Sequence, residues 1–163
     1  MCTSGKSPQL MRGPLGRQRG LVDSLDTLLG GEEPHATFHD ALVESITYDA
    51  VTRQAHVTAR LCVGDPSAPS NAERERRRRG TLDLRGVSHW RQEYTGAKPR
   101  DGFSLVSEGP LAEAPTEFAK QLLHEMGGRG IGWYFYFSDS NSYIYWIADG
   151  VEFRWLESRA PAA

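Results

Sequence analysis

Apolar and polar residues alternate along the chain from residue 42 onwards. The alternation is weak over 42–48 and clear over 55–63, and the turn-forming stretch "DAVTR" lies between them. A period of two is typical of a strand with one buried face, so we expect a hairpin here. The apolar positions of its second strand are Ala55, Val57, Ala59, Leu61 and Val63.

A third strand is expected in "TLDLRGVSHW", after a long arginine-rich loop over 64–80. Leu82 and Leu84 resume the alternation before Gly86 interrupts it. A glycine inside a strand pattern suggests a bulge, which would turn Val87 inward.

Two stretches have the spacing of a helix instead. In "LVDSLDTLLGG" five apolar residues over 21–29 lie on one helical face, and Gly30 suits the end of a short helix. In "APTEFAKQLLHEMGG" the stripe of Phe118, Leu122 and Met126 predicts a helix over 116–126. "FSLVS" before it could form a short strand, and "GGRGIG" after it would be a helix-to-strand turn rather than a phosphate loop.

The C-terminal segment predicts a three-stranded meander. Asp149-Gly150 is typical of a two-residue hairpin turn, and we place a second turn at Ser140-Asn141. The first turn would pair Ala148 with Val151, Trp146 with Phe153, and Ile144 with Trp155. The second would pair Phe137 with Ile144, Phe135 with Trp146, and Trp133 with Ala148. All of these side chains would share one apolar face, which would fill the interior.

These elements together predict an α+β protein that is mainly an antiparallel β sheet. We expect two hairpin or meander units with one or two short helices, arranged as a sandwich or a curved sheet. One globular domain would span 20–157, with disordered tails at 1–19 and 158–163. The first tail holds four basic and no acidic residues, a composition that favours disorder.

Composition limits the cellular compartments and the classes of partner that we expect for this protein. The formal net charge is −2, without the excess expected of an obligate nucleic-acid binder. Lys and Arg outnumber Asp and Glu by 15 to 12 over 1–100, but acids outnumber bases by 9 to 3 over 101–157. No apolar run approaches the roughly 20 residues needed to span a membrane, and no signal peptide is evident. Two cysteines make no disulfide framework, so we expect a reducing cytoplasm.

"FHDALVESITYDA" raises the question of whether His39 and Asp40 are a catalytic or metal-binding pair. Neighbouring side chains of a strand point to opposite faces, so Asp40 would not orient His39. His56 would lie opposite Thr47, about 25 Å from His39 along the strand, and a pair of His56 and His89 would be a poor zinc site. We therefore expect no metal, and we expect His39 and Asp40 to cap the start of the sheet.

The same stretch carries a resemblance to a family. "FHDALVESITYD", the alternating strand after it and "LDLRGV" resemble small bacterial β-rich domains that begin with a Phe/Leu-His-Asp element. Some of these domains are similar to immunity proteins of polymorphic toxin systems. The resemblance covers 38–90 and implies that Phe38, His39 and Asp40 are structural and that no residue is catalytic. The arginine-rich insertion and the basic tail depart from the pattern.

Two surfaces could bind a partner. In "ERERRRR" the side chains of Arg74 and of Arg76, Arg77, Arg78 and Arg79 could contact phosphates, or they could form a solvated hairpin tip. On the meander, Tyr134, Tyr136, Tyr145 and Arg154 have the composition of a recognition surface. Alternatively, the 116–126 helix would cover the tyrosines. Asp139, Asp149 and Glu152 would be exposed acids under either interpretation.

No arrangement of catalytic residues emerges, and no cofactor is implied. The leading hypothesis is a non-catalytic, cytoplasmic protein–protein interaction module, an immunity-type inhibitor that occludes a bacterial toxin through an acidic surface. The alternative is a nucleic-acid accessory protein that uses the basic tail and the arginines at 74–79. We expect no membrane association.

Overall fold

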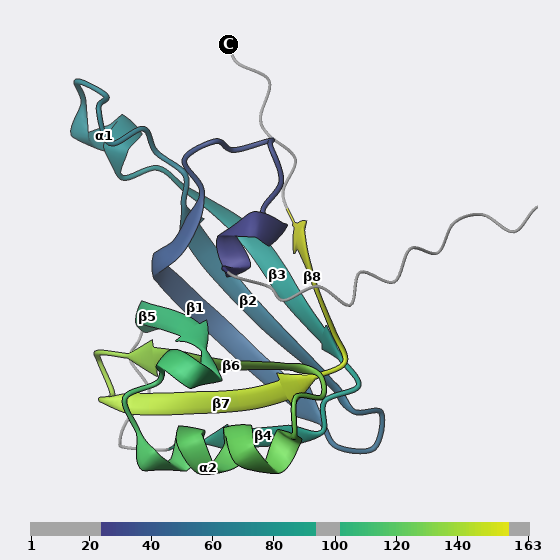
Figure 1. Ribbon diagram of the computed structural model, residues 1–163. Coiled ribbons are helices and arrows are strands. Elements are labelled where there is room, and N and C mark those ends of the chain that lie inside the picture. Colours follow the sequence, from purple (N-terminus) through teal and green to yellow (C-terminus); the bar gives the residue numbers. More distant parts are fainter. Residues whose placement is uncertain (1–23, 94–101, 157–163) are drawn as a thin grey trace, which may run out of the picture.

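The computed structural model describes residues 24–93 and 102–156, which form a curved antiparallel sheet with two short α-helices. This confirms the α+β class (Figure 1); the predicted tails at 1–19 and 158–163 lie outside the described residues. The elements in chain order are η1 (Leu25–Leu28), β1 (Thr37–Asp49), β2 (Gln54–Cys62), α1 (Asn71–Arg74), β3 (Arg77–Arg85), β4 (His89–Gln92), β5 (Phe103–Pro110), η2 (Leu111–Glu113), α2 (Glu117–Met126), β6 (Ile131–Phe137), β7 (Ser142–Ala148) and β8 (Gly150–Trp155).

The eight strands follow the order β4-β7-β6-β5-β1-β2-β3-β8. Figure 1 shows β1, β2, β3 and β8 running side by side, with β6 and β7 crossing them. At one corner β3 continues into β4 and β7 continues into β8. There the Asp149 amide donates to the Arg85 carbonyl (2.9 Å) and the Ser88 amide to the Ile147 carbonyl (2.9 Å). The hydrogen-bonded ladder therefore continues through the bend.

Gly86 makes this corner possible. Its φ is +63°, a left-handed conformation that suits glycine best. The bend turns Val87 inward, where its side chain is 1% exposed. The inward direction of Val87 is thus confirmed, although the chain after Gly86 starts a separate strand, β4, rather than continuing β3.

The sheet separates two apolar clusters. The inner cluster fills the concave side and includes η1 residues as well as side chains from most strands, among them Leu25, Val57, Leu84, Phe135 and Trp146. The second cluster lies between α2 and the outward side of β6 and β7. Each strand of β6 and β7 therefore buries both of its faces.

The predicted pairing of β7 with β8 is wrong. β8 pairs with β3 instead, so that Phe153 lies opposite Leu82 and Val151 opposite Leu84. Asp149-Gly150 is part of the corner and not a hairpin turn. The alternation of β8 fits either neighbour equally well, because it specifies which side chains point inward but not which strand lies alongside.

The turn between β6 and β7 is longer than predicted. Phe135 lies opposite Ile144 and Trp133 opposite Trp146, a shift of two residues from the expected pairs. The loop holds four residues, 138–141, and the Asn141 amide donates to the Ser138 carbonyl (3.3 Å). Since the shift is even, every side chain keeps its predicted face.

The boundaries of other elements also differ from the prediction. β1 begins at Thr37 rather than at residue 42, and the helix expected over 21–29 is a single 3-10 turn, η1, among the described residues. The loop expected over 64–80 contains α1 and the first residues of β3. By contrast, α2 is close to the prediction, with Thr116 capping its start and Gly127 ending it at φ +57°.

Candidate functional site

The tyrosine face comprises the outward side chains of β6 and β7, and α2 covers it. Tyr145 is fully buried and Tyr134 is nearly so, while Tyr136 and Tyr143 are half-buried. The Tyr145 hydroxyl donates to Thr116 Oγ1 (3.0 Å) at the start of α2. The structure therefore agrees with the packing alternative for this face.

Arg154 does not belong to the tyrosine face. It was expected beside Tyr136 and Tyr145, but it lies on β8 opposite Thr81 of β3. The cause is the wrong partner for β8, since the prediction of the row depended on β7 and β8 being neighbours. The four residues expected to form one recognition surface are therefore distributed over both halves of the sheet.

A different face is open to solvent, the outward side of β1, β2, β3 and β8. We call it the outer face, and within the described residues no helix packs on it. Its side chains alternate with those of the inner cluster, so their direction follows from the strand period. They include Glu44, Ser45, Thr47, His56, Thr58, Arg60, Arg77, Arg79, Thr81, Asp83, Arg85, Glu152 and Arg154.

One carboxylate bridges two arginines at the end of the outer face near α1. Arg60 and Arg79 are direct cross-strand partners, which places like charges side by side. Glu44 Oε1 accepts from Arg60 Nε (2.7 Å) and Glu44 Oε2 accepts from Arg79 Nε (2.7 Å). The register of β1 shifts between Val43 and Ser45, which brings Glu44 to this position.

The electrostatics of Glu44 follow from this geometry. Partial burial raises the pKa of the carboxyl, but the hydrogen bonds and charges of Arg79 and Arg60 outweigh burial and lower the pKa below its ordinary value. At neutral pH Glu44 is therefore an anion that holds two guanidinium groups in fixed positions.

A hollow of about 360 Å³ adjoins this cluster, lined by Asp40, Leu42, Arg60, Arg77 and Ser104. Asp40 has a φ of +59°, unusual for a residue with a side chain. Arg77 Nη1 donates to the Asp40 carbonyl (2.7 Å) and more weakly to that of Arg60 (3.5 Å). Within the described residues Arg77 donates to carbonyl oxygens and forms no ion pair with a carboxylate, while Asp40 borders the same hollow.

The expected capping role of His39 and Asp40 is wrong, because Asp26 of η1 takes it. Asp26 Oδ1 accepts from the Phe38 amide (2.8 Å) and Oδ2 from Thr37 Oγ1 (3.0 Å). His39 and Asp40 are exposed, and His39 Nε2 lies 3.5 Å from Asp40 Oδ2. These neighbours approach each other because the left-handed backbone at Asp40 breaks the strand alternation. Phe38 is buried.

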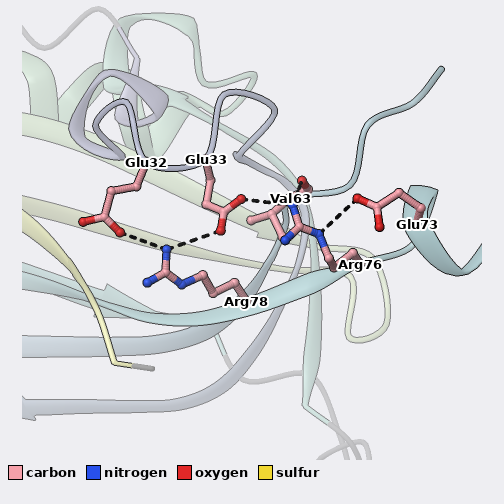
Figure 2. A network of polar contacts seen from close by, with 6 residues as sticks. All are labelled: Glu32, Glu33, Val63, Glu73, Arg76 and Arg78. Atoms are coloured by element: carbon pink, nitrogen blue, oxygen red, sulfur yellow. Dashed lines mark hydrogen bonds and ion pairs between the residues drawn. The ribbon is translucent and has the colours of Figure 1, made fainter. Parts of the chain in front are cut away.

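Arg76 and Arg78 point the other way and are tied to the loop before β1 (Figure 2). Arg76 Nη2 lies 3.1 Å from Glu33 Oε2, and Arg78 Nη1 contacts Glu32 Oε2 (3.0 Å) and Glu33 Oε1 (3.3 Å). Glu33 is 2% exposed, and the Arg78 guanidinium stacks 4.7 Å above the Trp155 ring. This network joins β3 to residues far away in the sequence.

The five arginines over 74–79 are therefore not one flexible finger, as the alternative hypothesis required. Arg74 ends α1, where its Nη1 donates to the Ala68 carbonyl (2.8 Å). Arg77 and Arg79 belong to the outer face because they alternate with Arg76 and Arg78 along β3. Sequence reasoning missed this division because it took the segment as a loop.

A second ordered group lies at the centre of the outer face. Asp83 Oδ1 is 2.6 Å from His56 Nδ1, and Asp83 Oδ2 accepts from Arg154 Nε (2.8 Å). Burial raises the pKa of Asp83, but bonding to Arg154 and His56 outweighs it and lowers the pKa overall. The predicted alignment of His56 with Thr47 is confirmed, whereas its proposed neighbour His89 is on β4, which pairs with β7.

The three acids expected to be exposed are exposed, but they do not form one patch. Asp139 is in the β6–β7 loop, where Oδ2 accepts from the Ser104 amide (2.6 Å). Asp149 is at the corner, 3.9 Å from Arg53 Nη2. Glu152 forms an ion pair with Arg85 on the outer face.

The described part of the chain contains no group of three or more His, Cys, Asp and Glu side chains placed to hold a metal ion. None of its helices has the length and apolar character needed to cross a membrane. Comparison of the chain with protein-family models, with curated proteins and with solved structures found no match. The resemblance to immunity-type domains remains a prediction.

Proposed function

We propose that this protein is a protein-binding module whose partner docks on the outer face. The observation that carries the proposal is that charged side chains on an uncovered sheet face are already held by one another in fixed geometry. Glu44 holds Arg60 and Arg79, and Asp83 holds His56 and Arg154. A partner would therefore order few side chains on binding, which lowers the entropic cost of association.

The charge of this face favours an acidic partner surface. Arg60 and Arg79 share the carboxylate of Glu44, and Arg77 and Asp40 border the adjoining hollow, so basic residues outnumber acidic ones here. Arg77 borders a hollow large enough for a side chain from the partner. A partner carboxylate there would meet a guanidinium group at close range, which favours rapid and specific encounter.

An immunity-type inhibitor remains the most specific form of this proposal. It is supported by the resemblance over 38–90, and the partner class that it names is a bacterial toxin. The acidic docking surface first expected for such a complex is replaced by the basic part of the outer face, since the candidate acids are dispersed. Inhibition would follow from occlusion, with no catalytic group required on this chain.

Nucleic acid fits the outer face less well. Three arginines within one short cluster contact far fewer phosphates than the extended basic surfaces of nucleic-acid binders. The described side chains of the outer face include no aromatic residue on which a base could stack.

The experiment uses the full chain and the toxin candidate encoded beside its gene. Coexpression should relieve growth arrest, and calorimetry should give the Kd. Arg77→Glu should weaken binding by at least about tenfold, because it reverses a positive charge at the docking surface. Lys120→Glu on exposed α2 changes the net charge equally and should leave the Kd unchanged.

Two outcomes would contradict the proposal. Equal Kd values for Arg77→Glu, Lys120→Glu and the unchanged chain would remove the outer face as the docking surface. Binding of labelled single-stranded DNA or RNA that weakens steeply with salt and is lost in Arg77→Glu, with no protein complex formed, would favour the nucleic-acid alternative. Circular dichroism of each variant checks that the fold is retained.

A further inference from the structure

Among the described residues, β8 is an edge strand with an unpaired side. It is the last strand of the sheet among the described residues and pairs only with β3. The Leu156 amide donates to the Arg79 carbonyl (3.0 Å). In an antiparallel pair, every second residue directs its amide and carbonyl toward the partner strand, so Arg154 and Glu152 also direct theirs toward β3. The backbone groups of Val151, Phe153 and Trp155 therefore point away from β3. An exposed row of this kind is a template for another strand.

The side chains of β8 are also incompletely covered. On the inner face Val151, Phe153 and Trp155 are half-buried, whereas Leu82 and Leu84 of the adjacent strand are fully buried. The difference arises because β3 has a neighbour on each side and β8 has one. A further strand beside β8 would bury the remaining apolar surface.

The outward side of β8 carries one acid and one base. Glu152 lies directly opposite Asp83 of β3, where like charges repel each other, and it forms an ion pair with Arg85, also on β3. Arg154 is two residues along and donates to Asp83. A strand that placed a cation on the free side of Glu152 would complement this arrangement.

We propose that β8 pairs with β8 of a second copy of this chain, antiparallel about a twofold axis at Phe153. In that register Glu152 lies opposite Arg154 of the second copy, and the reverse pair forms by symmetry. Phe153 lies opposite Phe153 of the second copy. Its amide and carbonyl, which point away from β3, form hydrogen bonds across the axis. Val151 and Trp155 face each other in the same way.

Other registers lose these matches. An axis at Glu152 or at Arg154 places identical charges opposite each other. An axis at Val151 or Trp155 shortens the paired segment and leaves the Glu–Arg pairs unmade. The register with its axis at Phe153 is therefore the one that forms backbone hydrogen bonds, pairs opposite charges and keeps the paired segment long.

The other edge strand is a weaker candidate. β4 is four residues long, and short edge strands are a common protection against pairing. Its Trp90 ring also stacks on Tyr48 of β1 at 5.4 Å between centroids, which holds this edge against the same molecule. β4 therefore serves as an internal comparison.

The test is the molar mass of the full chain, measured by light scattering and sedimentation over a dilution series from about 100 μM to about 1 μM, which yields the Kd of a micromolar dimer. We expect a dimer. Val151→Pro removes an amide that points away from β3, so it leaves the β3–β8 ladder intact and should weaken the dimer by at least about tenfold. Gln92→Pro makes the matched change on the free edge of β4 and should remain dimeric.

A cross-link tests the register independently of proline. With Cys2 and Cys62 replaced by Ser, Phe153→Cys should form an intermolecular disulfide, because cross-strand Cα atoms lie about 5.5 Å apart at the axis. Val151→Cys should not, because its two copies would be about 13 Å apart. A monomeric chain, an unchanged dimer in Val151→Pro, or a folded dimer without the Phe153→Cys cross-link would overturn the proposal.

Discussion

The tyrosine face and the outer face are both outward surfaces of one curved sheet, yet they are built for different environments. The tyrosine face carries large rings on β6 and β7 and is covered by α2. The outer face carries arginines, carboxylates, a histidine and threonines and stays in solvent. The comparison teaches that aromatic composition by itself does not identify a recognition surface, since these rings are needed for packing.

Polar groups are satisfied differently on the two faces. On the tyrosine face hydroxyl groups find partners at the rim, as Tyr134 does with Ser107 at 3.2 Å between the oxygens. On the outer face the carboxylates of Glu44 and Asp83 each contact two basic side chains. The first arrangement supports a packed interface, and the second supports a rigid charged surface.

The largest expected effect is on the covered face. Leu122→Ala removes a buried side chain of α2 and should lower the free energy of unfolding by about 2–5 kcal/mol. Leu123→Ala alters the next residue of the same helix, which is exposed, and should change stability by less than about 0.5 kcal/mol. Urea denaturation measures both. Equal values would mean that α2 does not pack on the tyrosine face.

A smaller loss is expected at the centre of the outer face. Asp83→Asn keeps the size of the side chain but removes the charge that accepts from His56 and Arg154. Because Asp83 is 9% exposed, we expect a loss of about 1–3 kcal/mol. Glu75→Gln, at the exposed end of α1, should be nearly neutral. If Asp83→Asn unfolds at the same urea concentration as the unchanged chain, the group does not order the face.

The smallest expected effect depends on pH. Glu44→Gln should cost at most about 1 kcal/mol at neutral pH, since both arginine partners are well exposed. The pKa of Glu44 is below its ordinary 4.5 in the folded chain. Its contribution is therefore complete above that value and is lost as the pH falls through the lowered folded pKa.

Thermal unfolding between neutral and acid pH measures the difference between Glu44→Gln and the unchanged chain. This difference should shrink towards zero on acidification. Glu117→Gln, on the exposed side of α2, is the control and should differ little from the unchanged chain at any pH. A Glu44→Gln difference that grows in acid would contradict the assigned bridge.

Short-range sequence patterns predicted an element well where all of its signals lie within that element. α2 follows from a stripe of apolar residues with a threonine cap and a glycine stop, all of which act within one helix. The faces of β6 and β7 were also correct despite a wrong register, because an even shift preserves them. The His56–Asp83 pair required the offset between β2 and β3, which the chain between them does not reveal. The strained backbone at Asp40 has no sequence signal that distinguishes it from an ordinary turn.

The sequence by itself determined which side chains of each strand point inward, and that one helix would need an apolar face to cover. It could do so because side-chain periodicity is a local property of the backbone. Only the tertiary structure decided that β8 leaves β7 for β3, and that Arg77 and Arg79 separate from Arg76 and Arg78. Strand neighbours are chosen by competition among many compatible edges across the whole chain, and alternation is the same for every candidate partner.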